Sequence, residues 1–174
     1  MNAQGKRFEF EFLLRQKGFE RILAPYARNL KKLGISMNYR TVDSSLYERH
    51  ARTFEYDMVV TSFPQSASPG NEQRSMFHSA TANEQGSMNM PGISNPVVDA
   101  MVEEIISAKD RRQLVTACRA LDRVLMYQDY VVPNWYVNNH RIAYRDIFEI
   151  PKTLPLYYDP ETWLLQTWSM KNKH

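Results

Sequence analysis

The chain has 174 residues, of which 43% are hydrophobic and 24% are charged, and its net charge at pH 7 is +3. This length allows about one domain with one hydrophobic core and is too short for two full lobes around a ligand. No apolar run approaches the roughly 18 residues that a membrane span requires, and the N-terminus lacks the pattern of a signal peptide.

The first 34 residues predict a strand followed by a helix. Residues 8–14 alternate aromatic or aliphatic side chains with acidic ones, which is typical of a strand with one apolar face. After Gly18, apolar residues recur at intervals of three, four and seven, which predicts an amphipathic helix that Pro25 either kinks or opens. Two lysines precede Gly34, so we expect this glycine at the C′ position that ends the helix.

Two more strands and a second helix follow. Residues 35–42 alternate again and predict a strand, after which Ser45 and Glu48 have the spacing of a capping box that opens a short helix to about Arg52. Residues 56–61 form a short apolar run, as expected of a strand buried on both faces of a parallel sheet. The order predicts an α/β fold with a βαβαβ sheet and flanking helices.

The longest irregular stretch lies just beyond this third strand. Residues 62–71 are rich in Pro, Ser and Gly, and only residues 72–77 of the stretch that continues to Asn95 suggest a brief helix. Ligands of open α/β sheets collect at the carboxyl ends of the strands. Long loops inside compact domains are commonly either functional or disordered, and we expect the ligand at this one.

Two helices and two short strands are predicted in the remainder. Asn95 precedes Pro96 at the first position of one helix, and Asp110 caps a second helix that runs to about Gln128. Residues 131–137 and 141–144 predict short strands separated by a turn. The last thirty residues have no clear periodicity, although they contain two tyrosines and two tryptophans, namely Tyr157, Tyr158, Trp163 and Trp168.

No pattern of catalytic or metal-binding residues stands out. The four histidines (His50, His78, His140 and His174) lack metal-ligand spacing, so we expect no metal and no cofactor. The single cysteine, Cys118, excludes an internal disulfide and falls on an apolar helix stripe, which indicates a core residue. There is no nucleophile elbow or phosphate loop, and the basic residues are scattered, so we expect neither an enzyme nor a nucleic-acid-binding protein.

Several ordered segments resemble a known family. They are similar to the C-terminal lobe of the extracytoplasmic peptide-binding proteins of ABC importers, the oligopeptide, dipeptide and nickel class known as solute-binding protein family 5. The segments are residues 30–35 (LKKLGI), 40–43 (RTVD), 56–59 (YDMV), 92–96 (GISNP) with Asp99, and 121–136. The resemblance covers about residues 8–145, and residues 66–74 (SASPGNEQR) resemble the Yej-type subgroup, importers of peptides and of a peptide–nucleotide antibiotic.

The resemblance implies a fold, a location and partners. Residues 1–144 would form the C-terminal α/β lobe of a type II periplasmic binding protein, and residues 145–174 a tail that packs on an N-terminal lobe absent from this chain. The whole protein would close over an extended peptide in the periplasm and deliver it to membrane permease subunits. The chain would then be a fragment, which accounts for the missing signal peptide, and alone it is expected to self-associate or to leave its tail disordered. The alternative is a stand-alone protein-interaction module that uses the aromatic tail.

The residues expected to line the cleft follow from this position in the fold. They are Ser62, Phe63, Gln65, Arg74, Phe77, His78 and Asn89. In oligopeptide- and dipeptide-binding members, an aspartate just after the third strand pairs with the ligand's α-amino group; the equivalent position here lies near Gln65, with no acid until Glu72. The hypothesis is therefore an N-blocked or differently oriented peptide. Arg74 is the candidate for binding a carboxylate or phosphate, with a solvent-facing loop arginine as the equal alternative.

Overall fold

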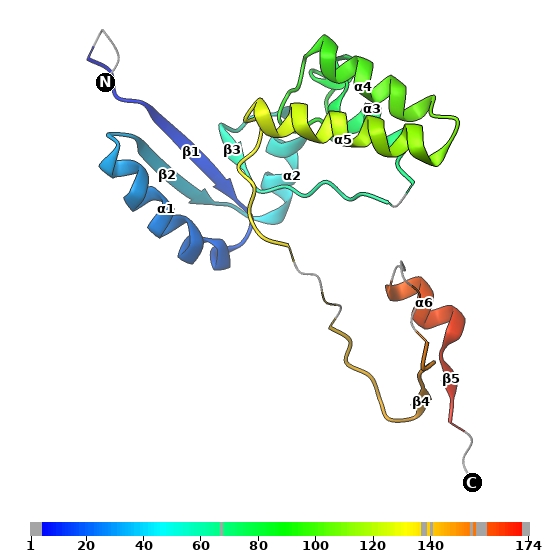
Figure 1. The fold of residues 1–174 in the computed structure, drawn as a ribbon. Helices are drawn as coiled ribbons and strands as arrows, with labels where there is room; N and C mark the ends of the chain where they lie inside the picture. Colours follow the sequence, from blue (N-terminus) through cyan, green and yellow to red (C-terminus); the bar gives the residue numbers. More distant parts are fainter. Residues whose placement is uncertain are drawn as a thin grey trace. The chain divides into compact units, whose positions relative to one another are not determined.

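The computed structural model describes residues 5–66, 68–136, 139, 141–153, 155 and 160–171 (Figure 1). The chain forms two compact units, Met1–Val131 and Val132–His174. The boundary expected at residue 144 falls inside the second unit, and the assignment of the units to lobes stays a prediction. No helix among the described residues is long and apolar enough to cross a membrane.

A parallel sheet of three strands forms one part of the first unit. Its strands are β1 (Glu9–Leu14), β2 (Ser36–Thr41) and β3 (Met58–Val59), in the order β2-β1-β3. Phe12 of β1 is aligned with Tyr39 of β2 on one side and with Met58 of β3 on the other. The predicted α/β fold with a βαβαβ arrangement is therefore confirmed.

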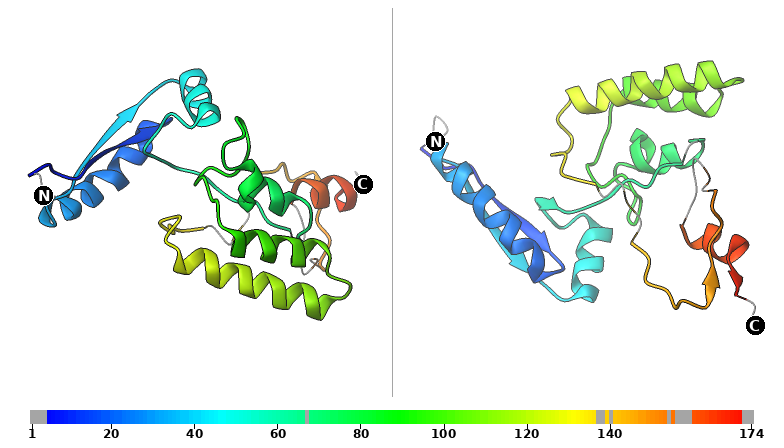
Figure 2. Two further views of the ribbon diagram at one scale, coloured as in Figure 1. Left: turned by 90° about the horizontal axis from the view of Figure 1, so that it is seen from above. Right: turned by 60° about the horizontal axis from the view of Figure 1, so that its bottom comes forward.

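One face of this sheet is covered by α1 (Glu20–Lys32), which follows the short 3₁₀ turn Lys17–Phe19 (Figures 1 and 2). Alternate residues of β1 pack on the helix, because successive side chains of a strand point to opposite faces. The buried cluster between them comprises Phe12, Leu14, Leu23 and Met37, with Phe10, Phe19 and Tyr26 partly buried around it.

The end of α1 confirms the prediction for Gly34. The glycine has φ +78 and donates its N–H to the Lys31 carbonyl, while the Ile35 N–H bonds to the Leu30 carbonyl. These two bonds define a Schellman motif, which satisfies carbonyls that the helix end would otherwise leave open. Pro25 lies inside the helix and does not open it.

Two predicted details of the sheet region are wrong. The cap of α2 (Ser44–Thr53) is Asp43 and not the Ser45 capping box, because the Asp43 carboxylate already accepts the Leu46 N–H at 3.0 Å. β3 has two residues, both half-buried, and not a fully buried strand over residues 56–61. Among the described strands it pairs with β1 alone, so it is an edge strand.

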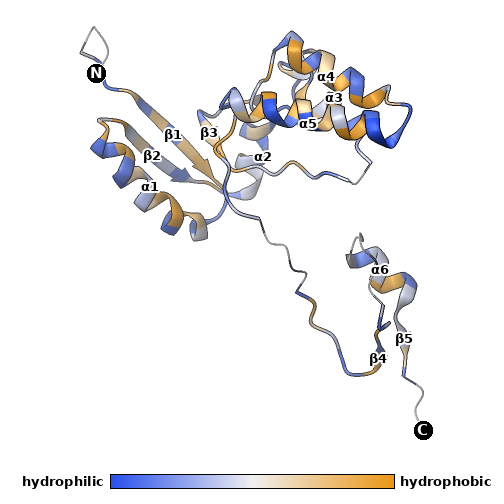
Figure 3. Cartoon of the chain, viewed as in Figure 1, coloured by the Kyte–Doolittle hydropathy of each residue, from blue (hydrophilic) through white to orange (hydrophobic). Residues whose placement is uncertain are grey.

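Helices form the other part of the first unit. They are α3 (Glu72–Phe77), a 3₁₀ turn at Ser79–Thr81, α4 (Pro96–Ile106) and α5 (Arg111–Tyr127). Asn95 caps α4 by accepting the Val97 N–H, and Asp110 caps α5 by accepting the Gln113 N–H, so both predicted helix starts are confirmed. α4 and α5 lie side by side in Figures 1 and 2, and around α1, α4 and α5 hydrophilic residues alternate with hydrophobic ones (Figure 3).

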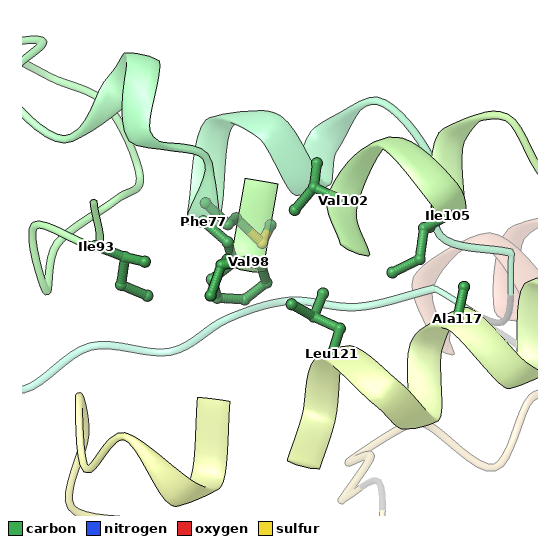
Figure 4. Packing of buried hydrophobic residues seen from close by; sticks show 8 residues of the cluster. Phe77, Ile93, Val98, Val102, Ile105, Ala117 and Leu121 are labelled. Atoms are coloured by element: carbon green, nitrogen blue, oxygen red, sulfur yellow. The ribbon is translucent and has the colours of Figure 1, made fainter. Parts of the chain in front are cut away.

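A second hydrophobic core joins these helices (Figure 4). Val98 and Val102 of α4, one turn apart, are fully buried and face α5. Burial of each such side chain contributes about 1.5–3 kcal/mol. The buried members of the cluster are Met76, Phe77, Ile93, Val98, Val102, Ile105, Ala117 and Leu121.

The second unit contains short elements only. β4 (Phe148–Glu149) pairs antiparallel with β5 (Ser169–Met170), and α6 (Pro160–Thr167) precedes β5. Trp163 is buried, and its ring lies 5.7 Å from the Trp168 ring in a T-shaped contact. Tyr144 makes a second T-shaped contact with Trp168 at 4.9 Å.

The strands predicted at 131–137 and 141–144 are wrong for the described residues 131–136 and 141–144, which are irregular. Pro133 has no N–H to donate to a ladder, and a strand forms only where a neighbour supplies hydrogen bonds. Val137, Asn138, His140, Tyr157, Tyr158 and His174 lie outside the described residues.

Candidate ligand-binding site

A groove lies beside the irregular segment that follows β3. It has a volume of about 470 Å³ and is bounded by this segment, by α3 and by one side of α5. We call it the α5 groove; its lining residues are Phe63, Gln65, Ser66, Pro69, Gln73, Phe77, Ile105, Arg111, Leu114, Val115, Cys118, Arg119, Leu121, Asp122 and Leu125. The segment starts at the carboxyl edge of the parallel sheet, where α/β proteins collect their ligands.

Three of the seven expected cleft residues line this groove. They are Phe63, Gln65 and Phe77. The rings of Phe63 and Phe77 are 5.4 Å apart and tilted by 39°, so an aromatic pair holds the irregular segment against α3. Ser62 precedes Phe63 on the same segment and is exposed, outside the lining.

Gln65 is held in place by neutral contacts. Its Oε1 accepts a hydrogen bond from Gln73 Nε2 at 2.8 Å, and its Nε2 donates to Met76 Sδ at 3.4 Å. Gln73 is almost completely buried, with 2% of its surface exposed. The groove therefore has an oriented, uncharged amide near the position where the oligopeptide- and dipeptide-binding proteins are expected to have an aspartate.

Arg74 pairs with a carboxylate of the chain itself. Its Nε donates to Glu103 Oε1 at 2.7 Å and its second nitrogen to Glu103 Oε2 at 2.5 Å, which ties α3 to α4. The hydrogen bond from Arg74 holds the pKa of Glu103 below its usual value, and the same bond raises the pKa of Arg74. An anionic ligand at Arg74 would have to displace Glu103.

His78 caps the 3₁₀ turn that follows α3. Its Nδ1 accepts the Ala80 N–H at 3.0 Å, so the neutral ring carries its proton on Nε2. That nitrogen lies 4.0 Å from Glu103 Oε1, and Nδ1 lies 3.8 Å from Asp99 Oδ1. Within the described part of the chain, no group of His, Cys, Asp and Glu side chains could hold a metal ion.

Asn89 is fully buried, and its side chain forms hydrogen bonds with backbone groups of the loop before α4. Its Oδ1 accepts the Ile93 N–H at 2.8 Å, and its Nδ2 donates to the carbonyls of Ile93 at 2.9 Å and His78 at 3.2 Å. Gly92 provides the positive φ of +65 that this turn requires. Asn89 is thus not accessible to a ligand, and it stabilises the backbone between His78 and Ile93.

The α5 wall is the part that sequence reasoning missed. Leu114, Cys118, Leu121 and Leu125 recur at intervals of three and four in the sequence, which predicts an apolar stripe on the helix. Such a stripe does not tell which of its members face a partner helix and which face a groove. Asp122 also lines the groove, so the structure supplies an acid that the segment after β3 lacks before Glu72.

Cys118 is a free, half-buried thiol on this wall. Burial raises the pKa of the thiol, and the nearby positive charge of Arg111 offsets this in part. The thiol is therefore less reactive at neutral pH than an ordinary exposed cysteine.

Comparison with known proteins finds relatives in bacteria, while no family model matches the chain. It is 50% identical over 161 residues to the uncharacterized protein y4wM of Sinorhizobium fredii, covering 91% of this chain and 24% of that protein. It is 44% identical over 171 residues to the "Probable peptide-binding protein YejA" of Agrobacterium fabrum, covering 97% and 27%. The "Peptidoglycan-binding protein YepA" of the same organism is 33% identical, with 96% and 26% covered.

Solved structures agree with the fold. The oligopeptide-binding protein AppA of Bacillus subtilis, in complex with a nonapeptide, matches 74% of this chain with a TM-score of 0.65 and 23% identity. A periplasmic oligopeptide-binding protein of Thermotoga maritima matches 77% with a TM-score of 0.64 and 19% identity. In both cases 26% of the solved chain is covered. The present chain thus spans about a quarter of the length of the proteins that it matches.

Proposed function

We propose that this chain, which belongs to the family of Yej-type and related peptide-binding proteins, acts in the solute-binding component of a peptide ABC importer. In this role it captures peptides in the periplasm and passes them to permease subunits in the membrane. The observation that carries the proposal is the α5 groove, which is bounded by the irregular segment that follows β3. The relatives named by activity are binding proteins, and we propose a binding role without catalysis.

The segment after β3 is the proposed contact with the peptide main chain. Ser62 and Gln65 of this segment are exposed. The ring pair of Phe63 and Phe77 forms an apolar part of the groove lining. Main-chain hydrogen bonds bind peptides with little regard for their side chains. We assign Arg74, His78 and Asn89 to support of this wall, because each of them already has partners within the chain.

The proposed peptide does not present a free amino group at Gln65. An ammonium placed there would meet a neutral amide held by Gln73 and Met76. If the bound peptide removes this ammonium from water without an opposite charge beside it, the free-energy cost is large. We therefore propose N-blocked peptides, including peptide conjugates, or peptides whose amino end lies elsewhere in the site.

Calorimetry with matched peptides tests this proposal. We expect an N-formylated peptide to bind the chain at least as tightly as the same peptide with a free amine. Gln65→Asp should favour the free amine by about tenfold, because it adds a carboxylate at that position. Ser68→Asp is the matched control, since Ser68 is exposed on the same segment and outside the groove lining. A strong preference of the unmodified chain for the free amine would overturn the N-blocked proposal.

One observation supports the alternative of a protein-interaction module. The second unit exposes large apolar side chains, among them Tyr136 at 85% and Leu165 at 84%. Trp168 Nε1 is buried and has no hydrogen-bond partner among the described residues. Such a module would bind a partner through this unit, and substitutions in the α5 groove would leave that binding unchanged.

A further inference from the structure

The α5 groove combines an apolar body with charged residues from a single helix. Its lining residues on α5 recur at intervals of three and four along one side of the helix. Leu114, Leu121 and Leu125 face the aromatic pair Phe63 and Phe77. An apolar surface of this kind favours the binding of an apolar side chain, because the side chain is removed from water.

The size of the groove suits part of a peptide. Pockets for small ligands commonly measure about 300–1,000 Å³. At about 470 Å³, the α5 groove accepts one large side chain together with its neighbouring residue. Cys118, half-buried in the wall, leaves room that a larger residue at this position would fill.

Charged residues set the polarity of the groove. Arg111, Arg119 and Asp122 line it, so two guanidinium groups stand against one carboxylate. Arg119 and Asp122 are exposed, and neither forms an ion pair with another of the residues that the structure describes. A guanidinium fork binds a carboxylate through two parallel hydrogen bonds.

We infer that the α5 groove is a specificity pocket for a large apolar residue of the ligand that is followed by an acidic residue. The apolar side chain packs on the apolar lining, to which Phe63 and Leu125 contribute, and the adjacent carboxylate pairs with Arg119. This inference rests on the proposed function and adds the class of peptide to it. The Asp122 carboxylate in the same lining disfavours a ligand that is acidic throughout.

Four capped dipeptide amides test the inference by calorimetry with the whole chain. They are N-acetyl-Phe-Glu, N-acetyl-Phe-Gln, N-acetyl-Phe-Lys and N-acetyl-Ser-Glu amide. We expect Phe-Glu to bind about tenfold more tightly than Phe-Lys, because one charge-assisted hydrogen-bond pair is gained and one repulsion avoided. Ser-Glu should also lose about tenfold, because the apolar contact is missing.

Two charge reversals on α5 distinguish the effect of an arginine in the groove from the effect of the net charge of the helix. Arg119→Glu should invert the preference between Phe-Glu and Phe-Lys. Arg123→Glu makes the same change in net charge at an exposed residue outside the groove lining, and it should keep the preference. Phe-Glu should also slow the alkylation of Cys118 by iodoacetamide, which locates the peptide in the groove.

The outcomes distinguish the two levels of the proposal. If the four peptides bind equally and Arg119→Glu changes nothing, the specificity inference is wrong and the peptide-binding function stands. If none of them binds, and free and N-formylated longer peptides also fail, the proposed function itself is wrong. If Phe-Glu binds selectively but leaves Cys118 alkylation unchanged, the selectivity arises elsewhere and the groove assignment is overturned.

Discussion

At the residue scale, the polar side chains near the candidate site differ in what they leave for a ligand. Gln65 keeps an exposed amide whose orientation is set by two contacts. The Asn89 amide is hydrogen-bonded to the loop before α4, and the Arg74 guanidinium is hydrogen-bonded to Glu103. All three are polar residues in or near the irregular stretch after β3, so the sequence does not distinguish them. Only the packing shows which side chain is available to a ligand and which one supports the structure.

Asn89 should be a major determinant of stability. Asn89→Ala leaves the Ile93 N–H and carbonyl buried without their partner, and we expect it to lower the free energy of unfolding by about 2 kcal/mol. Urea unfolding followed by circular dichroism measures this. Asn71→Ala is the control, because Asn71 is exposed and its side chain makes no cap hydrogen bond. Equal stability of the two variants would show that the Asn89 network contributes little.

Tyr56 should make the first unit sensitive to alkaline pH. Its hydroxyl donates to the Met90 carbonyl at 2.8 Å, and burial raises its pKa from 10.0 to about 12. The unfolded chain therefore loses this proton at a lower pH than the folded chain. The stabilisation is complete below pH 10 and is lost as the pH rises towards 12; because the residue is partly exposed, it amounts to about 1–2 kcal/mol.

Comparison with Tyr56→Phe isolates this contribution, since the other tyrosines titrate in both proteins. The stability difference between the wild-type chain and this variant should shrink between pH 9 and pH 11.5 in urea unfolding. A difference that stays constant over this range would contradict the role of the Tyr56 hydroxyl.

At the element scale, local signals predicted the helix ends better than the strands. Gly34, Asn95 and Asp110 act through hydrogen bonds to residues within a few positions, which the sequence displays directly. The length of β3 and the irregular backbone at residues 131–136 depend on whether a neighbouring strand is present, which no local pattern reveals. The α5 groove likewise needs residues from two distant segments, so only its half on residues 63–77 could be predicted.

The thiol on the α5 wall gives a chemical test of burial in the groove. Because burial raises the pKa of Cys118, its alkylation at pH 7.5 should be slower than that of free cysteine. The pH at which the rate reaches half its maximum should also lie above that of free cysteine. Stopped-time alkylation with mass detection measures both, and a rate and midpoint equal to those of free cysteine would mean that the wall is open to water.

At the scale of the whole molecule, the chain covers about a quarter of the length of the proteins that it matches. The parallel sheet and the α4–α5 pair form a unit with two hydrophobic clusters, and this part could be predicted from the sequence. The structure of the second unit could not be predicted from the sequence, because its aromatic residues have no regular spacing. They pack around Trp163 and Trp168.

We propose that the exposed apolar residues of the second unit cause self-association of the isolated chain. Large exposed apolar patches mark association surfaces, and Leu165 is 84% exposed on α6. Sedimentation velocity should show association that increases with concentration, and Leu165→Glu should reduce it. Gln166→Glu, a change at the adjacent exposed position, is the control. A monomer at all concentrations would overturn this proposal.

We propose that peptides bind to the first unit, along the segment after β3 and the α5 groove. Hydrogen exchange of the chain, measured by mass spectrometry with and without a saturating N-formylated peptide, tests it most directly. We expect slower exchange in residues 62–77 and 111–125, and unchanged exchange in residues 141–171. Protection confined to residues 141–171, or no protection in any segment while calorimetry detects binding, would contradict it.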